Sequence, residues 1–242
     1  MKKRWGFILM LLIMVVLFSG CTEQFSEEEN RMLIKETTMR VIEGAKTDVE
    51  KAEKIFYFIR DEIKFGWVFP QEIPAADVLR NGKGVCMQKA NLQVAMMREA
   101  GLKARFHFIY VSKKALEDFL PGFAYNNWPE SFAHTFPEVL LNGKWVSVEA
   151  TFDKELHDIC LRKQLNFTKN QTIVDQCSMT FSVDGVKGHQ QYLEIKGKES
   201  FYGNSLEEFT KYLHAEVPWW KRLMQPLIFK KADKMMTQYR NF

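Results

Sequence analysis

The sequence predicts an α+β fold in which a helix that begins at Cys86 packs against a small antiparallel sheet. The first indication is an apolar stripe at helical spacing within residues 47–63. The second is a pair of glycines, Gly82 and Gly84, directly before Cys86 and the helical segment that follows it. The third is Asn142-Gly143 between two apolar runs, which is the strongest short signal for a β-hairpin.

The N-terminus has the form of an export signal and is not expected to be part of the fold. Lys2-Lys3-Arg4 is a basic start, and the apolar run after it has about 14 residues, short for a bilayer-spanning helix and typical of a secretory leader. The run ends in small residues directly before Cys21, as in a bacterial lipobox. We therefore expect residues 1–20 to be a lipoprotein signal peptide and Cys21 to carry the lipid. An uncleaved anchor is the alternative, and either one places the remainder on the extracytoplasmic face of a membrane.

The charge balance argues against a nucleic-acid partner. The chain has 34 Lys and Arg against 30 Asp and Glu side chains, a formal net charge of +4. Removal of residues 1–20 takes away three cations and no acid, so that 31 cations remain against 30 acids. Nucleic-acid binding needs a strong local excess of cations. The 222 residues that remain are enough for one good core and an appendage.

Two helices are expected before Cys86. Residues 21–46 form the lipid-anchored N-terminal segment, and within it the stretch from residue 26 is acidic first and apolar later, as in a helix rising from the anchor. Thr47-Asp48-Val49-Glu50 then has the form of a capping box. The helix that it opens carries one apolar stripe formed by Ala52, Ile55, Phe56, Ile59 and Ile63.

The segment around Cys86 places its thiol at the start of the next helix. Gly82 and Gly84 allow the backbone to turn sharply into a helix over residues 86–100, and Gly101 is a natural stop for it. The partial positive charge at a helix N-terminus favours the thiolate form of a cysteine. Cys86 is therefore the candidate nucleophile of the chain.

A strand and a long loop separate this helix from the hairpin. Residues 103–111 alternate as a strand does, and Pro121-Gly122 then lies in a long irregular insertion. Loops of this length within a compact domain are usually binding loops or lids. The aromatic side chains of the insertion either line a substrate cleft or form a small core of the loop itself; they are Phe119, Phe123, Tyr125 and Trp128.

The Asn142-Gly143 turn fixes which residues of the hairpin face each other. If these two residues form the turn, the numbers of opposing partners sum to 285, so that His134 faces Thr151 and Phe136 faces Glu149. His134 and Glu149 then become diagonal neighbours on one face, about 7 Å apart at the backbone. The other face, expected to point to the core, carries Val139, Leu141, Val146, Val148 and Ala150.

Two residues leave questions about this hairpin that its pattern does not answer. Pro137 has no N–H to give to the ladder, so we expect its strand to lie at an edge or to contain a bulge. Asp153 has the same parity as Glu149, so that facing alone does not choose between the two carboxylates. The choice of Glu149 therefore depends on the motif in which it lies.

A thiol, an imidazole and a carboxylate in this chain order are the parts of an activated sulfur nucleophile. They lie in three blocks, which are Gly84-Val85-Cys86, His134-Thr135-Phe136-Pro137-Glu138-Val139 and Trp145-Val146-Ser147-Val148-Glu149-Ala150-Thr151. The blocks and their spacing resemble the transglutaminase-like superfamily, whose members read G-x-C, then H-x-W/F-x-E-V, then W-x-x-V-D-x-T. The resemblance covers roughly residues 47–153, and Glu149 stands where the family usually has Asp.

The resemblance implies a papain-like core, which we assign to residues 47–160. In it Cys86 attacks a carbonyl, His134 moves the proton and Glu149 orients the imidazole. An oxyanion donor is also needed; the backbone N–H of Cys86 or Met87 is one candidate, and Trp67 or Gln71 could add a side-chain donor, as in relatives. Packing in the core is the alternative role for Trp67, and the one that we favour.

The implied function is acyl transfer, or amide or peptide hydrolysis, through a cysteine thioester on a protein or peptide substrate. Resolution of the thioester by an amine gives a cross-link, and resolution by water gives hydrolysis. No cofactor is expected. The alternative is a catalytically inactive domain of the same family that acts as a binding module at the cell surface.

The remaining cysteines are Cys160 and Cys177. An exported chain permits a disulfide between them, which would close a loop of about 17 residues and contribute about 3 kcal/mol in the chain-entropy model. Two buried free thiols are the alternative. With His157 these cysteines lack the paired spacing of zinc ligands, so no metal site is expected.

Residues 161–242 form a C-terminal extension to which the sequence assigns no role. From Pro218 onward the extension mixes aromatic, Met, Leu and cationic side chains. That mixture fits a helix at a membrane interface. It also fits a helix that packs back on the domain with its cations in water.

The lipid anchor can be tested with a single substitution. A Cys21→Ser protein should leave the membrane fraction or remain as the unprocessed precursor, because the serine hydroxyl does not replace the thiol that carries the lipid. Cell fractionation, and mass spectrometry of the N-terminal peptide, measure this. Identical fractionation and migration of parent and variant, with no lipid mass on that peptide, would show that the anchor has been wrongly assigned.

Overall fold

The computed structural model describes residues 25–70, 73–163, 181, 200–208 and 219–241, and the statements below concern these residues. The leader and Cys21 lie outside them. Within the described ranges, no helix is long and apolar enough to cross a membrane.

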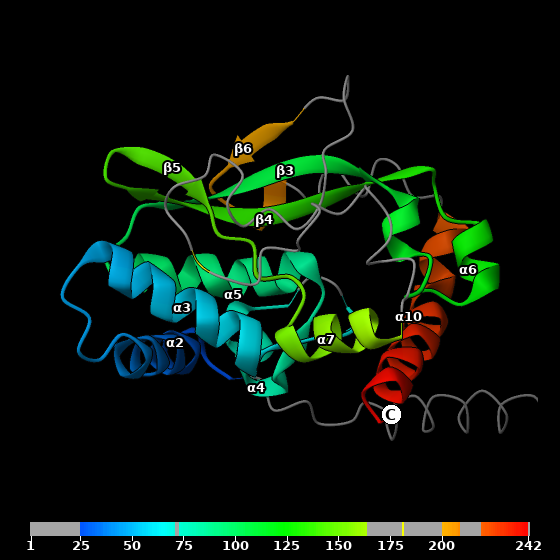
Figure 1. The fold of residues 1–242 in the computed structure, drawn as a ribbon, viewed down its shortest axis with the longest axis horizontal. Coiled ribbons are helices and arrows are strands. Elements are labelled where there is room, and N and C mark those ends of the chain that lie inside the picture. Colours follow the sequence, from blue (N-terminus) through cyan, green and yellow to red (C-terminus); the bar gives the residue numbers. More distant parts are fainter. Residues whose placement is uncertain (1–24, 71–72, 164–180, 182–199, 209–218, 242) are drawn as a thin grey trace, which may run out of the picture.

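A four-stranded antiparallel sheet packs on a layer of helices (Figure 1). The strands follow the spatial order β5-β4-β3-β6. Their bounds are Ala104–Ser112 for β3, Ser131–Leu141 for β4, Lys144–Ser147 for β5 and Phe201–Gly203 for β6. Helix α5 (Cys86–Glu99) lies against β3 and β4. The predicted α+β fold, with a cysteine-bearing helix on a small antiparallel sheet, is therefore confirmed.

Helix α5 is largely buried in the fold. It contacts the sheet on one side and three other helices elsewhere, which are α2 (Glu27–Val41), α3 (Asp48–Glu62) and α4 (Ala75–Asn81). Its apolar side chains Leu92, Val94, Met96 and Met97 are all buried, and so are its polar residues Gln88, Lys89 and Gln93. A helix surrounded on all sides by packed residues has a fixed position. The core therefore holds the start of α5, where Cys86 lies.

The N-terminal helices begin at the capping residues that the sequence suggested. Ser26 and Glu29 form a complete capping box on α2. On α3, the hydroxyl of Thr47 accepts the N–H of Glu50 at 3.2 Å, whereas the Glu50 carboxylate accepts the N–H of Lys46. Only one half of the expected capping box is therefore present on α3. The predicted stripe on this helix is fully buried.

The insertion before β4 is partly structured. It contains a short 3-10 helix, η1 (Lys113–Leu116), and the short helix α6 (Gly122–Asn126). Phe119 belongs to the domain core, where its ring lies 6.0 Å from that of Phe65. The Trp128 ring lies 6.4 Å from that of Trp67, whereas Phe123 is exposed. The four aromatics therefore do not form one separate cluster.

The C-terminal helix α10 (Trp219–Arg240) packs back on the domain through Phe229, Ala232 and Met236. Its earlier half leaves Leu223 and Leu227 exposed. The shorter helix α7 (Lys154–Arg162) lies beside it and carries Cys160. Cys160 is a free, fully buried thiol, and burial raises its pKa to about 12.

The described residues include only one half of the disulfide that the sequence suggested, namely Cys160. Its proposed partner, Cys177, lies outside the described residues, as do most of residues 161–200. The bridge therefore has no support in the described part of the chain, and its occurrence stays a prediction.

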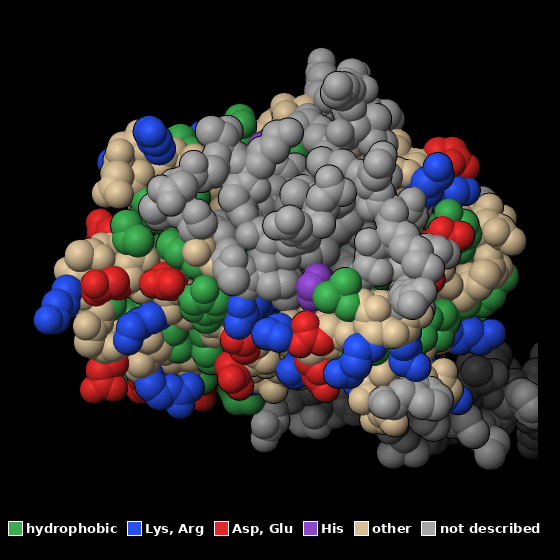
Figure 2. Space-filling view, in the orientation of Figure 1, with side chains coloured by type: hydrophobic (Ala, Val, Ile, Leu, Met, Phe, Trp, Pro, Cys, Tyr) green, Lys and Arg blue, Asp and Glu red, His purple; other side chains and the backbone are tan. Residues whose placement is uncertain are grey.

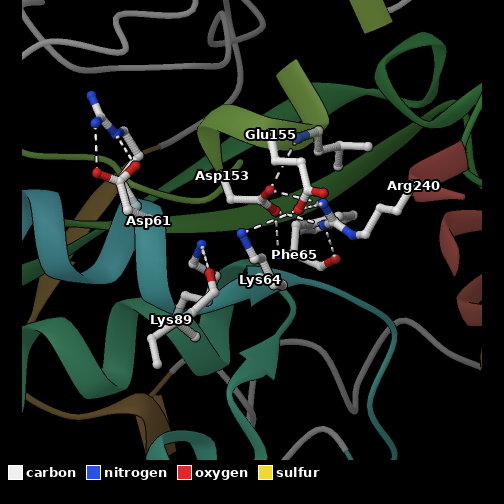
Figure 3. A network of polar contacts seen from close by, with 10 residues as sticks. Asp61, Lys64, Phe65, Lys89, Asp153, Glu155 and Arg240 are labelled. Atoms are coloured by element: carbon white, nitrogen blue, oxygen red, sulfur yellow. Dashed lines mark hydrogen bonds and ion pairs between the residues drawn. The ribbon is translucent and has the colours of Figure 1, made fainter. Parts of the chain in front are cut away.

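Lys89 is a fully buried cation one turn after Cys86 on α5. Its Nζ donates to the carbonyl oxygen of Ile63, directly after α3. Asp153 and Arg240 form the adjacent polar network (Figure 3). Burial lowers the pKa of Lys89 to about 7, although the Asp153 carboxylate opposes this shift.

The lowered pKa of Lys89 should make stability depend on pH. In the unfolded chain the amine titrates near 10.4, so between pH 7 and about 10 the unfolded state binds more protons and stability rises with pH. The difference between the pKa values of the folded and unfolded states sets an upper limit on this gain in stability, on the order of 4 to 5 kcal/mol. Between pH 7 and about 10, the unfolding temperature of the parent should therefore rise relative to that of Lys89→Met. Parallel curves for the two proteins would mean that Lys89 keeps an ordinary pKa.

Candidate active site

The start of α5 is built around Gly84 and Gln88. Val85 is the N-cap residue and offers no side-chain acceptor. Instead, its N–H donates to Gln88 Oε1 at 3.0 Å, and Gln88 Nε2 donates to the Pro70 carbonyl at 3.0 Å. A Cβ on Gly84 would lie 2.9 Å from the Gln88 Cβ, so glycine is needed there. Cys86 follows as the first helical residue, partly exposed to solvent.

The hairpin has the register that the sequence predicts. Glu138 pairs with Ser147 and Leu141 with Lys144, so that opposing numbers sum to 285. Asn142 and Gly143 form the turn with φ values of 50° and 78°. Strand β5 ends at Ser147, however, so the two rungs expected beyond it do not form.

The prediction that Pro137 marks an edge or a bulge is wrong. Strand β4 lies between β5 and β3. Its ladder with β3 passes Pro137 without a shift of register, and its ladder with β5 ends at the neighbouring pair of Glu138 and Ser147. The Val148 N–H donates to the Pro137 carbonyl at 3.0 Å, and in such a pair the proline would return an N–H to the Val148 carbonyl. Gln93 of α5 replaces that donor, since its Nε2 donates to the Val148 oxygen at 2.7 Å. A helix side chain therefore completes the ladder where proline cannot.

His134 and Glu149 meet beyond the last rung. The chain leaves β5 at this point, and His134 Nε2 lies 2.7 Å from Glu149 Oε1. Both side chains are buried, with relative exposures of 1% and 0%. The hairpin end is therefore part of the interior. The expected contact between the two residues is present.

Asp153 has a different place. Its carboxylate caps α7 by accepting the N–H of Leu156 at 3.0 Å and also accepts the N–H of Phe65 at 2.7 Å. Arg240 pairs with both of its oxygens. Desolvation opposes ionisation, but these partners, Arg240 foremost, lower the pKa of Asp153. Of the two carboxylates left open by parity, Glu149 is the one that contacts the imidazole.

His134 lies between the Glu149 carboxylate and the Cys86 sulfur. The ring bonds to Glu149 through Nε2, and it also interacts with the Cys86 sulfur. Because Nε2 is already engaged, we assign the contact with the sulfur to Nδ1. Burial alone would lower the pKa of His134, but Glu149 and Cys86 outweigh burial and raise it to about 10. The ring is then an imidazolium at neutral pH. In thiol enzymes, an imidazolium beside the nucleophilic sulfur favours its thiolate form.

Trp67 lies on a neighbouring segment. Strand β1 (Lys64–Phe65) runs parallel to β2 (Lys83–Gly84), with Phe65 opposite Gly84. Two residues further along each chain are Trp67 and Cys86. The indole Nε1 of Trp67 is buried and has no hydrogen-bond partner among the described residues. Gln71, the other candidate donor, lies outside the described residues.

Two positioning residues were missed from the sequence, namely Gln88 and Gln93. Both are polar residues on a buried helix, and each bonds to backbone far away in the sequence. A weak signal was present, because three polar side chains interrupt the apolar residues of α5 on what proves to be its buried surface. Polar groups in a core need partners, but the sequence does not identify these partners.

The paired charges predict how Cys86 reacts with iodoacetamide. His134→Ala should slow alkylation at pH 7 by about tenfold or more, since 1.4 kcal/mol of lost ion pairing is tenfold in rate. The advantage of the parent should fade as pH rises through about 10, where His134 loses its proton. Glu149→Gln should slow alkylation less strongly than His134→Ala does. It removes the charge that supports the imidazolium, but it leaves the imidazole beside Cys86.

Asp153→Asn is the matched control for Glu149→Gln. It should leave the alkylation rate of Cys86 near that of the parent but lower the unfolding temperature, because Asp153 pairs with Arg240. Rates come from the loss of free thiol, mapped to Cys86 by mass spectrometry. The reverse pattern would be slow alkylation in Asp153→Asn and an unchanged rate in Glu149→Gln. It would mean that Asp153, and not Glu149, is the carboxylate that supports His134.

Comparison with known proteins agrees with this geometry. The family model of the transglutaminase-like superfamily matches residues 35–150. None of the curated protein sequences matches the chain. A solved structure of a suspected cysteine protease from Cytophaga hutchinsonii is 19% identical with a TM-score of 0.38, over 50% of this chain and 37% of that one.

A second solved structure, of a suspected protease from Parabacteroides distasonis, is 14% identical with a TM-score of 0.32, over 47% of this chain and 22% of that one. The chain therefore spans well under half the length of either protein. The family match includes Cys86, His134 and Glu149. Residues 35–150 of this chain belong to the transglutaminase-like superfamily.

Proposed function

We propose that the chain is a thiol enzyme that transfers or hydrolyses an acyl group through a thioester on Cys86. The observation that carries this proposal is the position of His134, buried between the Glu149 carboxylate at 2.7 Å and the Cys86 sulfur. A buried imidazolium is costly unless it is paired. Here its two partners are those that a thiol nucleophile requires.

The reaction would proceed in two halves. The Cys86 thiolate attacks the carbonyl carbon, so that a carbon–sulfur bond forms and the carbonyl π electrons move to oxygen. Collapse of this tetrahedral species breaks the bond to the leaving amine, which takes the proton from His134 Nδ1. Water or a second amine then attacks the thioester and returns a proton to His134, and the sulfur leaves as thiolate. Glu149 holds the ring in place throughout.

The negative oxygen of the tetrahedral species needs donors. The N–H groups at the start of α5 point along the positive end of the helix dipole. The Trp67 indole N–H is the side-chain donor that we assign, because it is buried without a partner in the part of the chain that the structure describes, and its segment runs beside the start of α5. An unsatisfied buried donor costs free energy, which an acceptor on the substrate would recover.

The substrate class that fits this chemistry is an amide of a protein or peptide, and the site requires no cofactor. We further propose that a lipid on Cys21 holds the enzyme at the extracytoplasmic face of the cell membrane, on the basis of the leader sequence. We do not propose a nucleic-acid partner, because the nearly balanced charge lacks the excess of cations that binding to phosphates needs. Figure 2 shows Lys and Arg side chains mixed with Asp and Glu on one face.

The proposal can be tested with p-nitrophenyl acetate, an activated ester that needs no specific substrate pocket. Mixing it with the parent should release a burst of nitrophenolate and leave an acetyl group on Cys86, mapped by mass spectrometry. Cys86→Ala should abolish both signals. Cys160→Ala is the matched control, because its thiol is buried with a pKa of about 12, and it should retain the burst.

Added amine distinguishes the two fates of the thioester. Transfer of the acetyl group to the amine would favour cross-linking, and faster loss to water would favour hydrolysis. A parent protein that is not acylated, or a burst that survives in Cys86→Ala, would contradict the thiol-enzyme proposal. The binding-module alternative would then take its place.

A further inference from the structure

The C-terminal helix α10 lies outside the family match, yet it is bonded to the segment that carries Trp67. The segment runs from β1 through Gly66 and Trp67 to Val68. Three side chains of α10 reach it, and they are spaced along the helix as Phe229, Asp233 and Arg240.

Asp233 binds the backbone of the segment directly. Its Oδ1 accepts the N–H of Trp67 at 3.2 Å, and its Oδ2 pairs with Lys83 Nζ at 2.6 Å. Lys83 belongs to β2, three residues before Cys86. A Cβ on Gly66 would lie 3.0 Å from the same Asp233 oxygen, so a glycine allows this close approach. One carboxylate therefore joins the Trp67 segment to the strand that leads into the Cys86 helix.

Phe229 fixes the indole itself. Its ring centroid lies 5.0 Å from that of Trp67 in an edge-to-face arrangement, and its side chain is 1% exposed. Such aromatic pairs contribute about 0.5 to 1.5 kcal/mol beyond the area that they bury. Trp128 lies on Trp67 as well, at 6.4 Å. The indole plane is therefore set by neighbours on two elements, of which α10 supplies the closer ring.

Arg240, near the C-terminal end of α10, binds the start of the same segment (Figure 3). Its NH2 group donates to the Phe65 carbonyl at 3.0 Å and to Asp153 Oδ2 at 2.7 Å. The same Asp153 oxygen accepts the Phe65 N–H at 2.7 Å. Phe65 leads to Trp67, and Asp153 lies four residues after Glu149. One guanidinium therefore ties together the segments that carry the oxyanion donor and the orienting carboxylate.

We infer that α10 is a positioning element of the active site, in which Asp233 and Phe229 hold the Trp67 indole N–H where the oxyanion forms and Arg240 fixes the start of that segment. The inference rests on the proposed thiol chemistry. None of these three residues touches Cys86, His134 or the reacting atoms in the described contacts. Their effect passes through Trp67, so they should influence acylation and not the intrinsic reactivity of the thiol.

Two probes separate these effects. Iodoacetamide reacts by displacement and forms no oxyanion, whereas p-nitrophenyl acetate must pass through one. Asp233→Ala should slow acylation of Cys86 by about tenfold to a hundredfold, since loss of one oxyanion donor costs 10²–10³. Its alkylation rate should stay within about twofold of the parent, since the Cys86–His134 pair is intact.

Two further variants guard against a general loss of fold. Asp233→Asn keeps an acceptor for the Trp67 N–H and should recover most of the acylation rate. Phe229→Leu keeps volume but loses the ring contact, and it should slow acylation while alkylation is unchanged. Asp158→Ala, which removes an exposed aspartate of a surface ion pair on α7, is the matched control and should change neither rate. Thermal unfolding is recorded for every variant.

The outcomes are distinct. If Asp233→Ala and Phe229→Leu slow both reactions equally, α10 is merely a stabilising helix and the inference fails. If neither variant slows acylation, the inference fails although the proposed function stands. If the parent reacts with neither probe, the proposed function fails and the inference falls with it. Selective loss of acylation, with recovery in Asp233→Asn, supports it.

Discussion

The active site depends on one buried cation, the imidazolium of His134. A charge with 1% exposure is stable only when opposite charge lies against it. Glu149 supplies that charge on one side, and the Cys86 sulfur interacts with the ring on the other. Together they raise the pKa of His134 to about 10, although burial opposes this shift. Each partner comes from a different element. The positions of α5, β4 and the chain after β5 are therefore all constrained by this pair of contacts.

Local sequence signals predicted the parts of the site that are set by local geometry. Asn142-Gly143 has the positive φ values that a tight hairpin needs, so the register of the whole hairpin followed from two residues. Gly84 before Cys86 meets a steric demand of the helix start. The alternation of side chains then placed Glu149 near His134. Each of these features is set by residues that lie close together in the chain, where the sequence is informative.

Long-range contacts could not be predicted in this way. Pro137 was taken to mark an edge or a bulge, because the rule considers the backbone alone, and the compensating donor of Gln93 comes from a helix more than forty residues away. Asp153 resembled a second candidate acid by parity, yet it caps α7 and binds Arg240. In both cases the sequence showed a polar group or a missing donor. Only the tertiary structure identifies its partner.

The same reasoning explains why a helix outside the family match is joined to the site. The carboxylate of Asp153 is 0% exposed and lies near the buried Lys89, so the interior beside α5 holds several charges that must balance. Arg240 provides the bidentate partner that a buried carboxylate favours. A helix that supplies such a partner cannot shift without leaving a charge unpaired. Electrostatic balance in the core therefore fixes α10, and α10 in turn fixes the backbone of Phe65 and Trp67 beside the nucleophile.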